Sequence, residues 1–217
     1  MDIQTRKAIP FEEVDISLLR QALSHYSKPD GKIGDMVCRG ELIRLRRGLY
    51  AVGAQYRQNP LSLEILANLL YGPSYISLEY ALSWYGMIPE RVAELTSVCL
   101  GRSRMFETPV GRFSYTFIPK KAYVEGYDLI ELSDGRTFLM ATREKALIDL
   151  IETQRTISLR SRKDMEQRLL ADLRMDESLL MTLDLKRFEY LADLYGSAKL
   201  KLLTGLLKKM IGGSQDE

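Results

Sequence analysis

The sequence contains a single histidine, His25, and only two cysteines, Cys38 and Cys99, among 217 residues. One histidine excludes most zinc sites and histidine-dependent hydrolases, so we expect no catalytic residue, no metal site and no cofactor. Two cysteines do not make a disulfide framework and are typical of a protein of the reducing cytoplasm. No signal-like segment or run of 18 apolar residues occurs, and no membrane partner is expected.

The composition favours a packed protein with little overall charge. Apolar residues make up 46% of the chain, which is ample for a core, and 31 basic residues face 29 acidic ones. The exception is residues 28–57, where seven basic and three acidic residues give a local charge of +4, more than the +2 of the whole chain. A surface for nucleic acid must therefore be local.

A basic hairpin is predicted inside this segment. Apolar and polar residues alternate over residues 42–46 with the period of two that a half-buried strand requires. Gly48 tolerates the positive φ of a tight turn, and residues 49–52 form the returning strand. Three arginines, Arg44, Arg46 and Arg47, then gather at one tip, where they contact phosphates or the minor groove of DNA. The alternative is a solvated hairpin edge protected by charge.

Two helices are predicted before the hairpin. Asp15 caps a helix that extends to residue 26, and Asp30 caps a shorter one that Gly40 ends. Lys32 and Arg39 lie on the outer face of the second helix, where they approach the major groove. Helix, helix and hairpin together predict a winged helix-turn-helix.

The whole chain is predicted to be α+β, with this winged helix-turn-helix followed by a mixed α/β domain that ends in helices. The boundaries are 1–59 for the DNA-binding domain, 60–211 for the C-terminal domain and 212–217 for a disordered tail. The predicted C-terminal elements are helices at 62–70 and 77–86, strands at 96–100, 113–118, 127–132 and 136–141, a helix capped by Thr142, and three further helices.

A second basic cluster lies in the C-terminal domain. Between residues 101 and 121, five basic residues accompany one acidic residue, which predicts a surface for nucleic acid or an acidic partner, with a solvated loop as the alternative. These basic residues are Arg102, Arg104, Arg112, Lys120 and Lys121.

Two further predictions concern residues 80–85 and 134–145. Tyr80, Trp84 and Tyr85 have helical spacing beside leucines and are predicted to be core residues. Glu144 and Lys145 with Asp134 are a loose match to a metal-dependent nuclease, but they lack the acidic-x-Lys spacing on a strand, and Glu144 at a helix start favours the helix dipole.

Three segments, residues 75–89, 108–113 and 142–150, occur in an order and spacing that resembles the AbiEi-like antitoxins of bacterial type IV toxin–antitoxin systems, which act in abortive infection. The sequence Arg-Arg-Gly-Leu-Tyr at 46–50 matches the basic run that ends the N-terminal winged helix of that family. The resemblance spans residues 32–151.

The resemblance implies an antitoxin that represses its own promoter and counteracts a nucleotidyltransferase-like toxin without forming a stable complex with it. Its expected partner is promoter duplex DNA, with an inverted repeat read by two copies. The five basic residues of the C-terminal cluster would then be the antitoxin surface. The alternatives are a protein or RNA interaction module without DNA affinity and, third, a metal-dependent nuclease.

Overall fold

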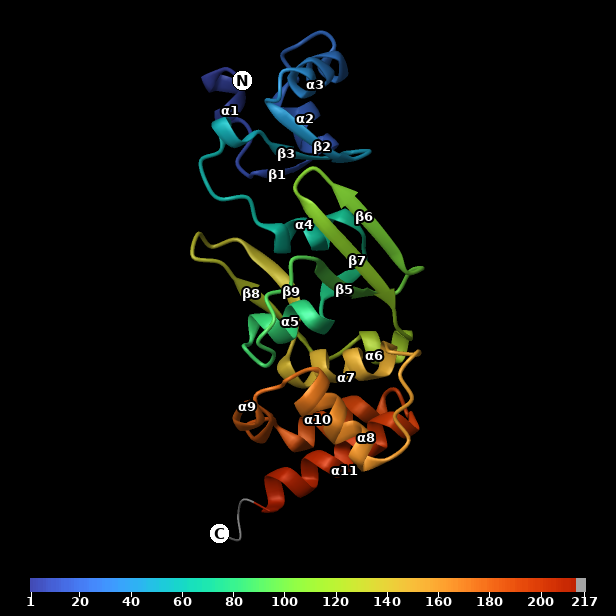
Figure 1. The fold of residues 1–217 in the computed structure, drawn as a ribbon. Helices are drawn as coiled ribbons and strands as arrows, with labels where there is room; N and C mark the ends of the chain where they lie inside the picture. Colours follow the sequence, from blue (N-terminus) through green and yellow to red (C-terminus); the bar gives the residue numbers. More distant parts are fainter. Residues whose placement is uncertain (214–217) are drawn as a thin grey trace.

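The computed structural model describes residues 1–213 and is α+β, as predicted, with helices at both ends (Figure 1). The first part of the chain builds a small antiparallel sheet in the order β1-β3-β2 under short helices. Its elements are α1 (Ile3–Lys7), β1 (Glu13–Asp15), α2 (Ile16–Ala22), α3 (Pro29–Cys38), β2 (Leu42–Arg46), β3 (Leu49–Val52) and the 3₁₀ turn η1 (Ala54–Tyr56).

The helix starts follow local capping chemistry, with one correction. Asp15 accepts hydrogen bonds from the backbone N–H groups of Ser17 and Leu18, which confirms the predicted start of α2. The predicted cap at Asp30 is wrong. Pro29 occupies the first helical position of α3, where its fixed φ suits the helix, and Asp30 lies in the first turn.

The β2–β3 hairpin is confirmed, with Gly48 at φ +83° in its turn. The pairing shifts between Arg44 and Arg46, so the hairpin contains a bulge. The strand β1, only three residues long, pairs with β3 and was not predicted.

The second part contains a six-stranded sheet in the order β6-β7-β5-β4-β9-β8, in which the β4–β9 and β5–β7 pairs are parallel. Its helix α4 packs against β4 and β9, and α5 packs against α7. The elements are α4 (Leu63–Leu70), β4 (Ser74–Ile76), α5 (Leu78–Trp84), β5 (Leu95–Cys99), β6 (Arg104–Thr108), β7 (Gly111–Phe117), α6 (Lys120–Tyr123), β8 (Tyr127–Glu131), β9 (Thr137–Ala141) and α7 (Arg143–Thr153).

The four predicted strands of this part correspond to β5, β7, β8 and β9, whereas β4 and β6 were not predicted. Thr142 caps α7 through its side-chain oxygen, as expected, and Ser62 caps α4 in the same way. Ser77 precedes α5 but makes no capping hydrogen bond, and its hydroxyl donates to Asp149.

The chain ends in helical segments packed below the sheet, as Figure 1 shows. They are α8 (Arg162–Glu166), the π-helical turn η2 (Gln167–Asp172), α9 (Glu177–Met181), α10 (Leu185–Asp193) and α11 (Ala198–Gly213). The expectation of three helices was too low because several segments are short. The first two residues of the predicted tail, Gly212 and Gly213, belong to α11, and its remainder, 214–217, lies outside the described residues.

Buried apolar side chains form two clusters. The smaller one lies within residues 9–52 and includes Leu19, Met36 and Val52. The larger one extends from α4 to α11 and also takes in Leu45 and Leu49 of the hairpin. The hairpin therefore packs on both sides, against its own unit and against the second.

Two carboxylates at the start of β1, from Glu12 just before the strand and Glu13 in it, hold the segment that joins these parts. Glu12 accepts hydrogen bonds from the backbone N–H groups of Gln58 and Asn59, both at 3.0 Å. Glu13 accepts from the N–H of Ser62 at 2.7 Å and forms an ion pair with Arg136 at 2.7 Å. These hydrogen bonds fix the backbone of residues 58–62, which connects the two parts.

Within residues 1–213, every helix is too short or too polar to cross a membrane.

Candidate nucleic-acid interface

An open groove of about 800 Å³ lies between α2, α3 and the β2–β3 hairpin. Ile33 and Val37 supply apolar walls, and Gly34 leaves open space beside the helix. The lining residues are Ile16, Arg20, Asp30, Ile33, Gly34, Val37, Cys38, Arg44, Arg47, Gly48 and Tyr50. The groove brings two of the predicted hairpin arginines next to α3.

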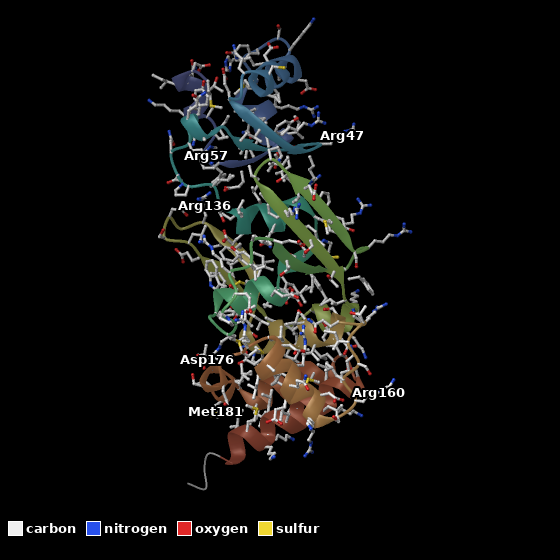
Figure 2. The ribbon with its side chains drawn as sticks, in the orientation of Figure 1. Arg47, Arg57, Arg136, Arg160, Asp176 and Met181 are labelled. Atoms are coloured by element: carbon white, nitrogen blue, oxygen red, sulfur yellow. The ribbon has the colours of Figure 1, made fainter. Side chains whose placement is uncertain are left out.

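The charges in the groove leave two guanidinium groups unpaired. Arg20 binds Asp30 with two hydrogen bonds of 2.8 and 2.9 Å, which lower the pKa of the Asp30 carboxyl. Arg44 and Arg47 are exposed, and neither forms an ion pair within residues 1–213. Figure 2 shows Arg47 extending from the hairpin tip into solvent. The net character of the groove is therefore cationic.

The structure does not bring Lys32 and Arg39 into this groove. At 100° per residue, these two residues lie on the side of α3 away from Gly34 and Cys38. The ammonium group of Lys32 lies 4.7 Å from the centre of the Tyr26 ring, and Arg39 pairs with Glu41 at 2.9 Å. Both cations are already engaged within the protein.

Arg46 also leaves the groove. Its guanidinium donates hydrogen bonds to the backbone carbonyls of Leu69 at 3.1 Å and Arg47 at 3.3 Å. Because Leu69 belongs to α4, this side chain points from the hairpin tip toward the second part of the molecule.

The predicted C-terminal basic cluster divides in two. Arg102 and Arg104 flank Ser103, whose hydroxyl accepts the N–H of Phe117 at the end of β7, and Lys120 and Lys121 follow three and four residues later. Arg112 lies at the opposite end of β7 and pairs with Glu107 at 3.3 Å. All five side chains are exposed.

A buried charge cluster is the main feature that sequence reasoning missed. Lys145 and Asp149, both with side chains 0% exposed, form an ion pair across one turn of α7. The Asp149 carboxylate also accepts hydrogen bonds from the hydroxyls of Tyr195 at 2.6 Å, Ser77 at 2.8 Å and Tyr75 at 3.3 Å. The signal available in the sequence was a Lys and an Asp four residues apart among apolar helix positions.

Burial sets the protonation of this cluster. It lowers the pKa of the Lys145 ammonium group, although the neighbouring Asp149 acts in the opposite direction. It raises the pKa of Tyr75 and of Tyr195, and the Asp149 charge adds to both shifts, so both phenols remain neutral donors. Gly126, at φ +90°, allows the chain to pass Lys145, because an added Cβ would lie 2.8 Å from its Cδ.

The residues that loosely matched a nuclease take part in separate contacts. Asp134 binds Arg136, Glu144 accepts the N–H of Asp184, and Lys145 pairs with Asp149. The expectation that Trp84 is a core residue is wrong, since it is 45% exposed and touches Phe138 edge-on.

The chain matches no protein-family model and no curated protein. The antitoxin resemblance therefore stays a prediction. Two of the segments that carry it, 75–89 and 142–150, meet at the buried cluster, where Tyr75 and Ser77 donate to Asp149.

Proposed function

We propose that this protein is a DNA-binding antitoxin that represses its own promoter from the cytoplasm, with residues 1–59 acting as a winged helix. The observation that carries the DNA-binding part is the pair of unpaired, exposed arginines, Arg44 and Arg47, in the groove beside α3. The element order from α1 to β3 and the sheet order β1-β3-β2 agree with a winged helix.

In this proposal α3 enters the major groove through its exposed small residues. Gly34 has no neighbouring atom within 4 Å of an added Cβ, so the helix backbone can approach a base edge or phosphate closely. Arg44 and Arg47 then bind phosphates, which fixes the position of the helix on the duplex. Lys32 and Arg39 contribute to the surrounding field but are not assigned contacts, because their partners are Tyr26 and Glu41.

The antitoxin part of the proposal rests on the sequence resemblance. The toxin would be a nucleotidyltransferase-like protein encoded beside this chain and opposed without a stable complex. Co-expression tests this part: the chain should restore growth to cells that produce the neighbouring toxin. Unchanged toxicity with the protein present and folded would refute it.

DNA binding is tested with the full-length protein and duplex DNA from its promoter, followed by fluorescence anisotropy over a salt series. Each phosphate contact contributes about 0.9 to the slope of log K against log salt, so R44A/R47A should reduce the slope by about 1.8. Arg160, at the far end of the molecule in Figure 2, provides a control for one lost charge: R160A is compared with the single variants R44A and R47A, each of which should reduce the slope by about 0.9. If R44A/R47A keeps the wild-type slope, the groove is not the DNA-binding site. If the wild-type protein does not bind duplex DNA, the alternative of a protein or RNA interaction module is favoured.

A further inference from the structure

We infer that the protein binds a nucleoside monophosphate in a cavity between the end of β7 and the end of α7. The cavity has a volume of about 530 Å³, within the range of small-molecule sites in proteins. In Figure 1 it lies where the end of α7 meets α6, the helix that follows β7. It shares no lining residue with the groove beside α3, and it does not depend on the proposed DNA binding.

The walls of the cavity are held in place by contacts behind them. Tyr195 contributes one wall, and its hydroxyl donates to the buried carboxylate of Asp149 at 2.6 Å. Glu152 contributes another, and its Oε2 accepts the hydroxyl of Ser197. Lys199 donates to three backbone carbonyls at the end of α7, at 3.0 to 3.3 Å. A ligand therefore meets a preformed surface, and Lys199 neutralises the negative end of the α7 dipole.

Three polar groups of the cavity have bonding capacity left for a ligand. Arg155 is exposed and forms no ion pair or hydrogen bond within residues 1–213. Glu152 uses only Oε2 for its hydrogen bond, so Oε1 is free to accept from an N–H or O–H group. Ser103 accepts the backbone N–H of Phe117 at 3.0 Å, which leaves the hydroxyl proton to donate. The cavity thus offers a cation, a strong acceptor and a donor.

An exposed aromatic ring completes the cavity. Phe117 is the last residue of β7 and is 44% exposed, whereas Phe113 on the same strand is 1% exposed. An exposed aromatic face is a stacking platform for a flat heterocycle, because every nucleobase has a π-face. Phe117 therefore adds a flat apolar contact to the three polar groups.

These groups together define the class of ligand. A carboxylate accepts hydrogen bonds and cannot donate them, so Glu152 selects a ligand that carries hydroxyl or N–H donors, as a ribose or a base does. Arg155 selects an anion, and its guanidinium fork suits a phosphate. A nucleoside monophosphate combines the flat ring, the donors and the phosphate in one molecule.

An adjoining cavity limits the ligand to a single nucleotide. It shares Thr116 and Thr153 with the first cavity and is also lined by Glu79 and Glu94. A strand that continued in this direction would place its next phosphate near these two carboxylates, which repel it. The ligand is therefore a free nucleotide or the terminal nucleotide of an RNA strand, which share this chemistry.

Isothermal titration calorimetry of the full-length protein with each of the four ribonucleoside monophosphates tests the site. F117A should weaken binding by at least about fivefold, the lower end of the effect of removing a stacking ring. R155A should weaken it by at least about tenfold, because the phosphate loses a charge-assisted hydrogen bond, and should leave the affinity for the nucleoside without phosphate unchanged.

Two matched controls remove the same groups outside the cavity. F11A removes a phenylalanine that is 49% exposed, and R160A removes an arginine from the same connection between α7 and α8 that contains Arg155 (Figure 2). Neither residue lines the cavity, so both variants should bind the nucleotide as wild type does.

The outcomes decide the assignment. Nucleotide binding that F117A and R155A weaken at unchanged melting temperature, and that the controls keep, would support it. An RNA trinucleotide with a terminal phosphate identifies the source: tighter binding than the free nucleotide assigns the end of a strand, and equal or weaker binding assigns the free nucleotide. The inference is overturned if inorganic phosphate binds as tightly as the nucleotide, if no nucleotide binds, or if F117A and R155A bind it like wild type. The proposed DNA binding would stand in each of these cases.

Discussion

The buried cluster around Asp149 predicts an unusual order of stabilities. Asp149 accepts hydrogen bonds from Lys145, Tyr195, Ser77 and Tyr75 and is fully buried. Three variants probe it: K145M, D149N and the double variant K145M/D149N. Met matches the length of Lys without its charge. Asn keeps only one of the two carboxylate oxygens, so it can accept some but not all of the three hydroxyls, which are divided between Oδ1 and Oδ2 of Asp149. We expect the double variant to be more stable than either single variant.

The magnitude follows from which partners remain. Removing one member of a buried ion pair costs about 3–5 kcal/mol, because the other charge is left uncompensated. In D149N the Lys145 ammonium keeps the Tyr195 hydroxyl, at 3.2 Å, and a neutral amide, so the loss should be near the upper end. In K145M the Asp149 carboxylate keeps all three hydroxyl donors, so the loss should be near the lower end. The double variant buries no charge and should lose about 1–2 kcal/mol.

Urea unfolding, followed by far-ultraviolet circular dichroism, gives the free energy of unfolding of wild type and the three variants. These four values form a double-mutant cycle, which isolates the coupling energy between Lys145 and Asp149. A double variant that loses the sum of the two single losses would refute the reasoning, because it would show that the two charges are not energetically coupled. Equal, small losses in all three variants would also contradict it, since they would place both groups in contact with water.

Two further predictions concern the junction and the buried tyrosines. R136A removes the ion pair to Glu13, whose side chain is 1% exposed, so it should lower the free energy of unfolding by about 3 kcal/mol and speed proteolysis of residues 53–62. The control is R187A: Arg187 lies 3.9 Å from the exposed Asp128, so its loss should lower the free energy of unfolding by less than about 1 kcal/mol. Equal losses in the two variants would contradict the prediction. Burial raises the pKa of Tyr123 to about 12, against about 10 in the unfolded chain, so its contribution to stability is complete below pH 10 and is lost as the pH rises toward 12. Because other buried tyrosines also titrate late, the measured quantity is the difference in phenolate absorbance between wild type and Y123F, which should titrate near pH 12; a difference that titrates near pH 10 would refute the prediction.

Local chemistry made part of this fold predictable. The cap at Asp15, the turn at Gly48 and the alternation over residues 42–46 depend on neighbours in sequence, and the structure contains each of them. The strand β6 was missed because it lies at the sheet edge with most of its side chains exposed, so it lacks an apolar period.

The side chains that were wrongly placed from the sequence are those whose positions depend on tertiary contacts. Asp30 resembles a helix cap, but its partner Arg20 comes from α2, ten residues away. Lys145 resembles a surface residue of a first helical turn, yet α10, the Gly126 crossing and Tyr195 enclose it. Likewise, Arg46 shares the hairpin tip with Arg47, and only the position of α4 decides that it turns away. Such contacts depend on distant segments, which no local pattern records.

The two carboxylates at the start of β1 have a consequence for how this chain can change over evolution. Glu12 and Glu13 hold the backbone of residues 58–62, and Glu13 also pairs with Arg136 on the turn between β8 and β9. A different N-terminal unit grafted onto this C-terminal part would leave Arg136 without its anion and the large cluster without Leu45 and Leu49. The two parts are therefore expected to be inherited together, as a matched pair rather than as interchangeable modules.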